Sequence, residues 1–150
     1  MDPYRKVEER ITRDIASATN IHDAADRVVA ALKETLPGYT WVGVYMLDGN
    51  ELVLGPYRGR PSPHTRIPVG RGICGAAAAE KTTIVVDDVS TDTRYLACSP
   101  DTQSEIVVPI MRGSTVLGEL DVDSDHPRAF HRRDRELLER VAGMLAEKSA

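Results

Sequence analysis

Residues 98–124 read C-S-P-D-T-Q-S-E-I-V-V-P-I-M-R-G-S-T-V-L-G-E-L-D-V-D-S, and the rest of the chain is organised around them. An apolar run, a turn at Arg112-Gly113-Ser114 and an alternating segment predict a β-hairpin over Ile106 to Ser124. The stretch also places Cys98 in a loop rich in Ser, Pro and Asp, and it places acidic residues inside strands. Acids are scarce in strands because burial removes their hydration. A group of acids beside a thiol therefore needs a chemical explanation.

Three acidic residues alternate along the second strand of this hairpin, so they point to one face of the sheet. They are Glu119, Asp121 and Asp123. The opposite face is expected to hold Val116, Leu120 and Val122. A solvent-facing acidic strand is the simpler interpretation of this alternation, and a functional acid cluster beside Cys98 is the alternative.

The position of Glu105 depends on the register of the hairpin. A two-residue turn at Gly113-Ser114 would pair Glu105 with Val122 and turn it away from the other acids. A three-residue loop or a β-bulge would instead place Glu105 opposite Asp121 or Asp123. The sequence leaves this choice open.

The composition bounds the class of protein. The chain has 150 residues, 41% hydrophobic and 28% charged, which predicts one globular domain over residues 1–150. The net charge of −4 argues against nucleic acid or an anionic membrane as partner. Without a membrane-length apolar run or a signal peptide, the expected location is the cytoplasm, where two cysteines stay thiols or cycle transiently.

Helical patterns flank a central region of strands. A narrow apolar stripe runs from Asp2 to Ala18, so this helix buries little alone and is a candidate for contact with a second subunit. Asn20 is expected to cap a helix from Ile21 to Thr35, and the closing helix is expected over Arg132 to Lys148.

Between these helices, apolar residues recur with a period of two. In residues 39–47, Val42, Val44 and Met46 share one face, whereas Trp41 and Tyr45 share the other. If the two aromatic residues lie on the acidic side of the sheet, they would form the apolar wall of a pocket; ordinary strand packing is the alternative. Hairpins without long crossovers predict an α+β fold, an antiparallel sheet covered by helices.

Cys74 lies in V-G-R-G-I-C-G-A-A-A-A, a Gly-rich entry to a short helix. The glycines satisfy G-x-G-x-x-G, but Arg66 and Pro68 precede them where a dinucleotide-binding unit has a buried apolar strand. The remaining expectation is that free N–H groups near Gly72 to Ala76 favour an anion and lower the pKa of a nearby thiol. A small residue packed at a tight turn is the alternative for Cys74.

No metal or cofactor is predicted. The chain contains no C-x-x-C motif, and its four histidines are scattered, so zinc ligation has no support. Cys98 is either an accessible nucleophile or a small loop residue.

Together these motifs resemble the GAF-domain free methionine-(R)-sulfoxide reductases. The resemblance extends from W-V-G-V-Y through L-V-L-G-P-Y, R-I-P-V-G-R-G-I-C-G, the Ala97-Cys98 loop and S-E-I-V-V-P-I to L-D-V-D-S. It implies an antiparallel GAF sheet of about six strands flanked by helices, a homodimer, and reduction of free methionine (R)-sulfoxide with thioredoxin as reductant.

The resemblance also implies roles for individual residues. Cys98 matches the catalytic cysteine of the family, and its active-site carboxylates match Glu105, Asp121 and Asp123. Trp41 and Tyr45 match aromatic residues of the substrate pocket.

The family has two further cysteines besides the catalytic one, and this chain matches only one of them. Cys74 matches a second cysteine, but His64 stands where many members carry a third cysteine that closes the disulfide with the catalytic one. Either Cys74 resolves the oxidised enzyme or an external thiol does.

The implied chemistry accounts for the grouping of acids. A thiolate attacks the sulfoxide sulfur, and the sulfoxide oxygen must be protonated. Carboxyl groups that lie close together cannot all ionise easily, so at least one of them stays protonated and can supply this proton. We assign that acid to Asp123, and the other acids to the substrate ammonium. Trp41 would hold the S-methyl group, and the N–H groups near Ile73 and Cys74 would bind the substrate carboxylate. The resulting sulfenic acid on Cys98 would condense to a disulfide.

Two other functions fit the sequence. A stand-alone GAF domain could be a small-ligand sensor, which would retain its ligand without turnover. A thiol redox sensor would form a Cys74–Cys98 bridge with peroxide and without a substrate.

Overall fold

The computed structural model describes residues 2–96 and 99–149, and its core is one six-stranded antiparallel sheet. Along the sheet the strands follow the order β3-β2-β1-β6-β5-β4. The α+β fold expected from the sequence, an antiparallel sheet of about six strands covered by helices, is confirmed. The elements are α1 (Pro3–Ser17), α2 (Ile21–Thr35), β1 (Trp41–Asp48), β2 (Glu51–Arg58), β3 (Arg66–Pro68), α3 (Gly72–Glu80), β4 (Ile84–Val86), the 3-10 helix η1 (Val89–Thr91), β5 (Ser104–Arg112), β6 (Thr115–Ser124) and α4 (Arg132–Lys148).

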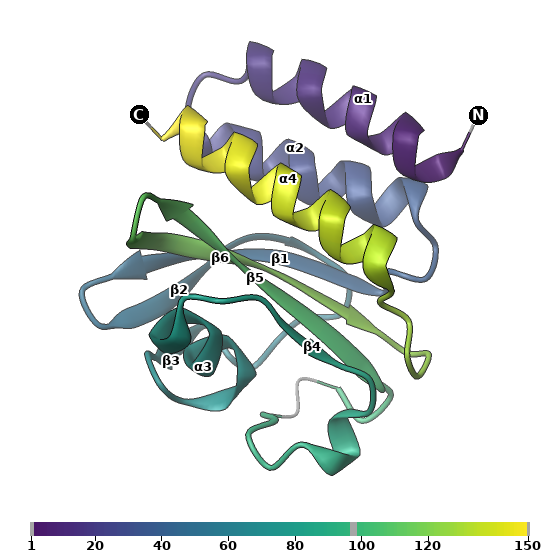
Figure 1. The fold of residues 1–150 in the computed structure, drawn as a ribbon, viewed down its shortest axis with the longest axis vertical. Coiled ribbons are helices and arrows are strands. Elements are labelled where there is room, and N and C mark those ends of the chain that lie inside the picture. Colours follow the sequence, from purple (N-terminus) through teal and green to yellow (C-terminus); the bar gives the residue numbers. More distant parts are fainter. Residues whose placement is uncertain (1, 97–98, 150) are drawn as a thin grey trace.

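The sheet has two differently covered faces (Figure 1). Helices α2 and α4 pack on one face, where Val42, Val44 and Leu120 belong to the main hydrophobic core. On the other face, α3 and the segment after β4 cover a second cluster that includes Trp41 and Tyr45. The predicted alternation of β1 is therefore confirmed.

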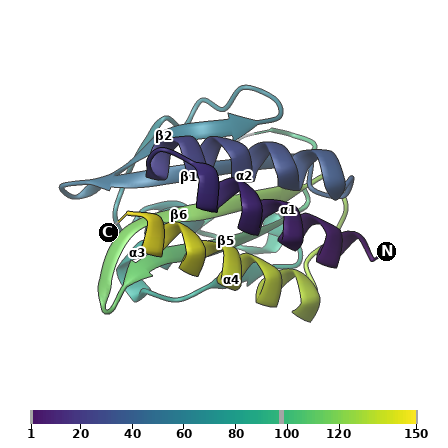
Figure 2. The ribbon, with the colours of Figure 1, turned by 90° about the horizontal axis from the view of Figure 1, so that it is seen from above.

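Helix α1 forms an outer layer over α2 and α4, as Figures 1 and 2 show. Its apolar stripe, Val7, Ile11 and Ile15, is buried in the main core. The stripe is thus covered by helices of the same chain, and contact between α1 and a second subunit stays a prediction.

Hydrogen bonds from single side chains fix the start of α2 and connect α4 to its neighbours. Asn20 caps α2 as expected, because its Oδ1 accepts a hydrogen bond from the Asp23 N–H at 2.8 Å. The buried Asp134 joins α4 to its neighbours: Oδ1 accepts from the hydroxyls of Tyr4 (3.0 Å) and Tyr39 (2.6 Å), and Oδ2 from the His131 N–H (2.9 Å). Both of its oxygens therefore have partners, as burial of a carboxylate requires.

The hairpin of β5 and β6 combines a two-residue turn with a β-bulge. Arg112 pairs with Thr115 across the turn, but Ile110 pairs with Gly118, so Leu117 is an extra residue in β6. The bulge shifts the register by one residue, and Glu105 pairs with Asp123.

The bulge also corrects one prediction. Val116 was expected on the face of Leu120 and Val122, but it belongs to the second cluster, under α3. The extra residue Leu117 reverses the alternation at this end of β6, so Leu117 packs against the main core in its place.

Candidate active site

Four carboxylic acids lie side by side under α3, on adjacent strands. Glu105 pairs with Asp123 across the β5–β6 ladder, and Asp123 pairs with Trp41 across the β6–β1 ladder. Glu119 and Asp121 continue this face along β6. The exposed fraction is at most 4% for any of the four side chains, so the alternative of a solvent-facing acidic strand is wrong.

Helix α3 brings Cys74 onto this acid cluster. Its Sγ–H donates a hydrogen bond to Oδ2 of Asp121 at 3.4 Å. The sulfur and one carboxyl oxygen each of Glu105 and Asp121 all lie within 4.8 Å of one another. Among the described residues these three could share a metal ion, and the absence of a metal stays a prediction.

A pocket opens beside this contact. Its walls include five predicted site residues and the residue that replaces the third family cysteine. They are Tyr45, Ile73, Cys74, Glu105, Asp121 and His64. The cavity volume is about 20 Å³, which is room for one water molecule. The pocket in this structure is therefore smaller than an amino acid.

Two predicted site residues, Trp41 and Asp123, are not on the wall of this pocket. They lie one row further along the sheet, where Asp123 is hydrogen-bonded to Glu105. Cys98 lies outside the described residues, so its predicted position beside the acids stays untested. The neighbouring Leu96 contributes to the pocket wall.

Several carboxyl oxygens of the acid cluster have no hydrogen-bond partner. Both carboxyl oxygens of Glu119, Oδ1 of Asp121 and Oδ1 of Asp123 are buried without a hydrogen-bond partner. Burial raises the pKa of all three side chains, and the charge of Asp121 further raises the pKa of Glu119 and Asp123. Hydrogen bonding to Glu105 counters the rise in pKa for Asp121 and Asp123. These acids therefore keep their protons to a higher pH than ordinary carboxyl groups do, which suits a proton donor.

The Cys74 thiol behaves differently from the sequence prediction. The N-terminus of α3 was expected to lower its pKa, but burial raises that pKa well above the ordinary value, and the neighbouring acids Asp121 and Glu119 raise it further. This prediction is wrong because desolvation and four nearby carboxyl groups outweigh the helix N-terminus. Cys74 is therefore a neutral thiol.

Glu119 is the residue that sequence reasoning left out of the site. It is fully buried, it pairs with Tyr45 across the β1–β6 ladder, and it raises the pKa of Cys74. The signal was present, because Glu119 alternates in step with Asp121 and Asp123. What the pattern could not reveal was that α3 buries this end of the strand as well.

The Trp41 indole is held from three sides. Its Nε1–H donates to the carbonyl oxygen of Arg60 at 3.0 Å, and its ring stacks on Tyr57 with centroids 5.7 Å apart. The ring also lies over Gly43, where an added Cβ would come within 2.3 Å of it. The Arg60 side chain is fixed in turn by two hydrogen bonds to Asp125, at 2.7 and 3.0 Å. The indole therefore has one preferred orientation beside the acid cluster.

We expect Gly43→Ala to displace this indole and to lower the free energy of unfolding by about 1–3 kcal/mol, because the new methyl group overpacks the ring. Trp41 is the only tryptophan in the chain, so its emission spectrum reports the displacement directly. Gly38→Ala is the matched control, since a Cβ there meets nothing within 4 Å. If Gly43→Ala left both emission and stability at the values of Gly38→Ala, the assigned packing would be wrong.

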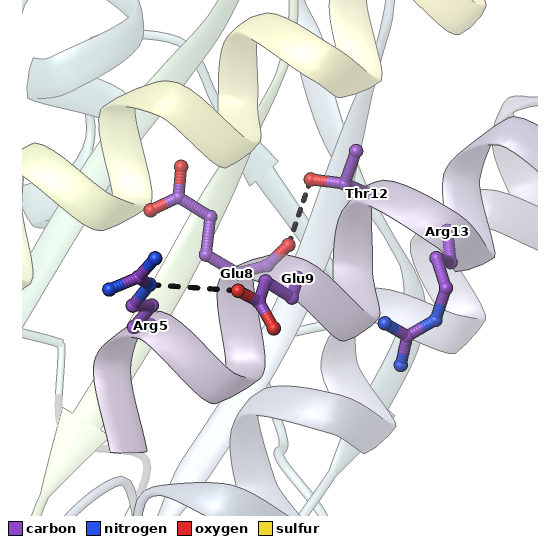
Figure 3. Close-up of a pocket in the computed structure, with 5 residues that line it drawn as sticks. All are labelled: Arg5, Glu8, Glu9, Thr12 and Arg13. Carbon is purple, nitrogen blue, oxygen red and sulfur yellow. Dashed lines mark hydrogen bonds and ion pairs between the residues drawn. The ribbon is translucent and has the colours of Figure 1, made fainter. Parts of the chain in front are cut away.

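A second hollow lies far from this cluster, on the outer surface of α1 (Figure 3). Arg5 and Glu9 pair along the helix at 3.6 Å, and Glu8 pairs with Arg140 of α4 at 2.8 Å. The Thr12 hydroxyl donates to the Glu8 carbonyl oxygen at 2.8 Å. Among the described residues that line this hollow, none has a buried side-chain polar atom without a hydrogen-bond partner, so it lacks the feature that distinguishes the acid cluster. Separately, no described helix is both long and apolar enough to cross a membrane.

Comparison with known proteins identifies related chains. The GAF domain family matches residues 20–147. GAF domain-containing protein A of Dictyostelium discoideum is 43% identical over 119 residues, which are 79% of this chain and 74% of that protein. The free methionine-R-sulfoxide reductase of Escherichia coli is 37% identical over 116 residues, 77% of this chain and 70% of the relative.

A solved structure agrees closely with the fold. The free methionine-R-sulfoxide reductase from Neisseria meningitidis, determined in complex with its substrate, superimposes with a TM-score of 0.92. It is 39% identical in sequence, and the match covers 97% of this chain and 87% of that one. The similarity therefore includes the sheet, α3 and the elements that carry the acid cluster.

Proposed function

Because this chain belongs to the GAF-domain family of free methionine-R-sulfoxide reductases, which are oxidoreductases, we propose that it reduces free L-methionine (R)-sulfoxide to methionine with Cys98 as the nucleophile. The observation that carries this proposal is the buried acid cluster, whose unpartnered carboxyl oxygens lie beside a pocket. Such a cluster has a use if the ligand is cationic and the reaction consumes a proton.

Recognition of the free amino acid rests on charge. In this proposal the substrate ammonium binds Asp121, which lines the pocket and has one oxygen without a partner. The substrate carboxylate binds the N–H groups at the start of α3, near Ile73 and Cys74, where no side-chain hydrogen bond from Arg71 caps the helix and the first N–H groups have no partner within it. Methionine within a peptide lacks the free ammonium, so the pocket selects against it.

The aromatic side chains set the orientation of the sulfoxide. In the proposed complex the substrate extends beyond the pocket wall to Trp41, which packs against the S-methyl group, and the fixed indole distinguishes the two epimers at sulfur. Tyr45 forms part of the pocket wall, and its hydroxyl donates to the His64 carbonyl oxygen at 2.9 Å.

The chemical step transfers oxygen from one sulfur to another. The Cys98 thiolate attacks the sulfoxide sulfur while Asp123 protonates the sulfoxide oxygen. Asp123 suits this role because burial and the charge of Asp121 raise its pKa, and because it is hydrogen-bonded to the pocket residue Glu105. In sum, the Cys98 thiolate, the sulfoxide and one proton from Asp123 become a sulfenic acid on Cys98 and methionine. The substrate sulfur gains two electrons and the cysteine sulfur loses two.

A second thiol restores the enzyme. It condenses with the sulfenic acid to form a disulfide and releases water. Thioredoxin then reduces this disulfide by exchange, in a cytoplasmic enzyme that we expect to be a homodimer. The resolving thiol is either Cys74 or an external one, and the burial and raised pKa of Cys74 favour the external thiol.

A thioredoxin-coupled assay on separated R and S epimers, free and peptide-bound, tests the proposal. We expect turnover of the free R epimer only. Tight retention of a small ligand without turnover would instead support a GAF sensor. A Cys74–Cys98 bridge that peroxide forms as readily as methionine sulfoxide would support a redox sensor.

A further inference from the structure

Cys74 is held at a fixed place by the glycines around it. Gly72 has a positive φ of 68°, and a Cβ there would come within 2.8 Å of the Leu96 side chain. A Cβ on Gly75 would lie 2.7 Å from the Pro68 carbonyl oxygen. The Gly70 N–H in turn donates to the Gly75 carbonyl oxygen at 2.8 Å. The start of α3 therefore packs closely against the preceding loop, and this packing fixes the position of the Cys74 thiol.

The fixed thiol holds one oxygen of a pocket carboxylate. Sγ–H of Cys74 donates to Oδ2 of Asp121 at 3.4 Å, while Oδ1 of the same side chain is buried without a partner. Asp121 is 1% exposed and lines the pocket. A carboxylate fixed through one oxygen presents the other in a defined direction, which is the arrangement that a charged hydrogen-bond donor needs.

We propose that Cys74 is a positioning residue for substrate binding, whose thiol holds Oδ2 of Asp121 so that Oδ1 accepts a hydrogen bond from the substrate ammonium. This inference rests on the proposed function and assigns Cys74 a role other than the resolving thiol. It also explains why one oxygen of Asp121 is paired and the other is not.

The environment of Cys74 fits a donor better than a nucleophile. A resolving thiol must ionise and reach the sulfenic acid, but Cys74 is only 6% exposed, and its pKa is raised by burial and by the adjacent acids. The same conditions keep the proton on sulfur, and only a protonated thiol can donate to Asp121. The burial and raised pKa that hinder a nucleophilic role for Cys74 therefore support its role as a hydrogen-bond donor.

Two substitutions separate the roles. Cys74→Ala removes the donor, whereas Cys74→Ser removes the thiol and restores a donor. For a positioning residue we expect KM for free methionine (R)-sulfoxide to rise about tenfold in Cys74→Ala with kcat within about threefold. Cys74→Ser should return KM to within about threefold of the wild-type value. Steady-state cycling with thioredoxin should continue in both variants.

Other results would overturn the inference. Equal and severe loss of cycling in both variants, with KM unchanged, would assign Cys74 to disulfide chemistry. A KM in Cys74→Ser as high as in Cys74→Ala would show that hydrogen-bond donation is not the cause.

Binding of methionine, measured by calorimetry, keeps this inference separate from the proposed function, because the product retains the ammonium and needs no turnover. Weaker binding to Cys74→Ala than to the wild type and Cys74→Ser supports the positioning role. Equal binding to all three proteins contradicts it. A wild-type protein that binds methionine but does not reduce the sulfoxide would contradict only the proposed function.

Discussion

Cys98→Ser is expected to lose methionine formation by a factor of about 10⁴ or more, in the coupled assay and in a single turnover. A hydroxyl is a far weaker nucleophile than a thiolate near neutral pH. It also cannot take the oxygen atom, because the product would contain an O–O bond in place of a sulfenic acid. The acids would still bind and protonate the substrate, but no atom would accept the oxygen. Methionine released from the separated R epimer is the quantity to measure.

A neighbouring substitution in the same loop is the control for this loss. Ser99→Ala changes a residue whose Oγ accepts a hydrogen bond from the Asp101 N–H at 3.3 Å, and turnover should stay close to the wild-type rate. In the wild type without reductant, mass spectrometry should find one added oxygen on Cys98 after a single turnover. Sustained turnover by Cys98→Ser would show that another residue is the nucleophile.

Much of the fold could be predicted because its signals are local. Asn20 caps α2 through one side chain, and the alternation in Trp41–Asp48 assigned residues to the two faces of β1 before any contact was known. These features depend on a few consecutive residues, so the sequence contains all of their causes.

The register of β5 and β6 was not determined by local signals. The turn at Gly113-Ser114 has two residues, which alone would have turned Glu105 away from the acids, and the bulge at Leu117 corrects the register. Gly118 was the available signal, since glycine within a strand often marks a bulge or close backbone approach. A Cβ on Gly118 would lie 2.2 Å from the Tyr45 carbonyl oxygen of the adjacent strand. That contact is tertiary, which is why the pattern alone left two registers open.

The burial of the acidic face of the sheet by α3 likewise could not be predicted from the sequence pattern. The sequence predicted that Asp121 and Asp123 share one face of the sheet, but it could not show whether that face is exposed to solvent. It also assigned Cys74 a lowered pKa from its place near a helix N-terminus. In the structure the Cys74 thiol is buried beside carboxyl groups, and both burial and these groups raise its pKa instead of lowering it. Electrostatics at this site depends on which helix covers the strand, and that is a long-range property.

The buried acids should make the protein most stable at mildly acidic pH. The folded-state pKa is raised for Glu119, Asp121 and Asp123 from ordinary values of 4.5, 3.8 and 3.8, so the native state binds more protons than the unfolded one. Stability from these groups is fully present below pH 4 and is lost as pH rises through the folded pKa of each. The slope is up to about 1.4 kcal/mol per pH unit for each titrating acid.

Surface acids oppose this trend only at low pH. The pKa of Asp125 is lowered by its hydrogen bonds to Arg60, and that of Asp92 by Arg94, so they add stability above pH 4 that is lost as pH falls further. Both carboxylates are partly exposed and pair with arginines at the protein surface, where ion pairs contribute little to stability. The free energy of unfolding should therefore fall between about pH 5 and pH 8, as measured by urea denaturation without ligand.

Glu119→Gln tests the origin of this dependence. The amide cannot ionise, so the fall in unfolding free energy between pH 5 and pH 8 should become shallower by up to about 1.4 kcal/mol per pH unit, and the variant should exceed the wild type in stability at the alkaline end. Near pH 5 the two should be similar, because a neutral carboxylic acid and an amide are close in size and polarity. Glu147→Gln, at an exposed position on α4, is the matched control and should keep the wild-type slope. A slope unchanged by Glu119→Gln would mean that this carboxyl group is already ionised in the native protein, and the raised pKa assigned to Glu119 would be wrong.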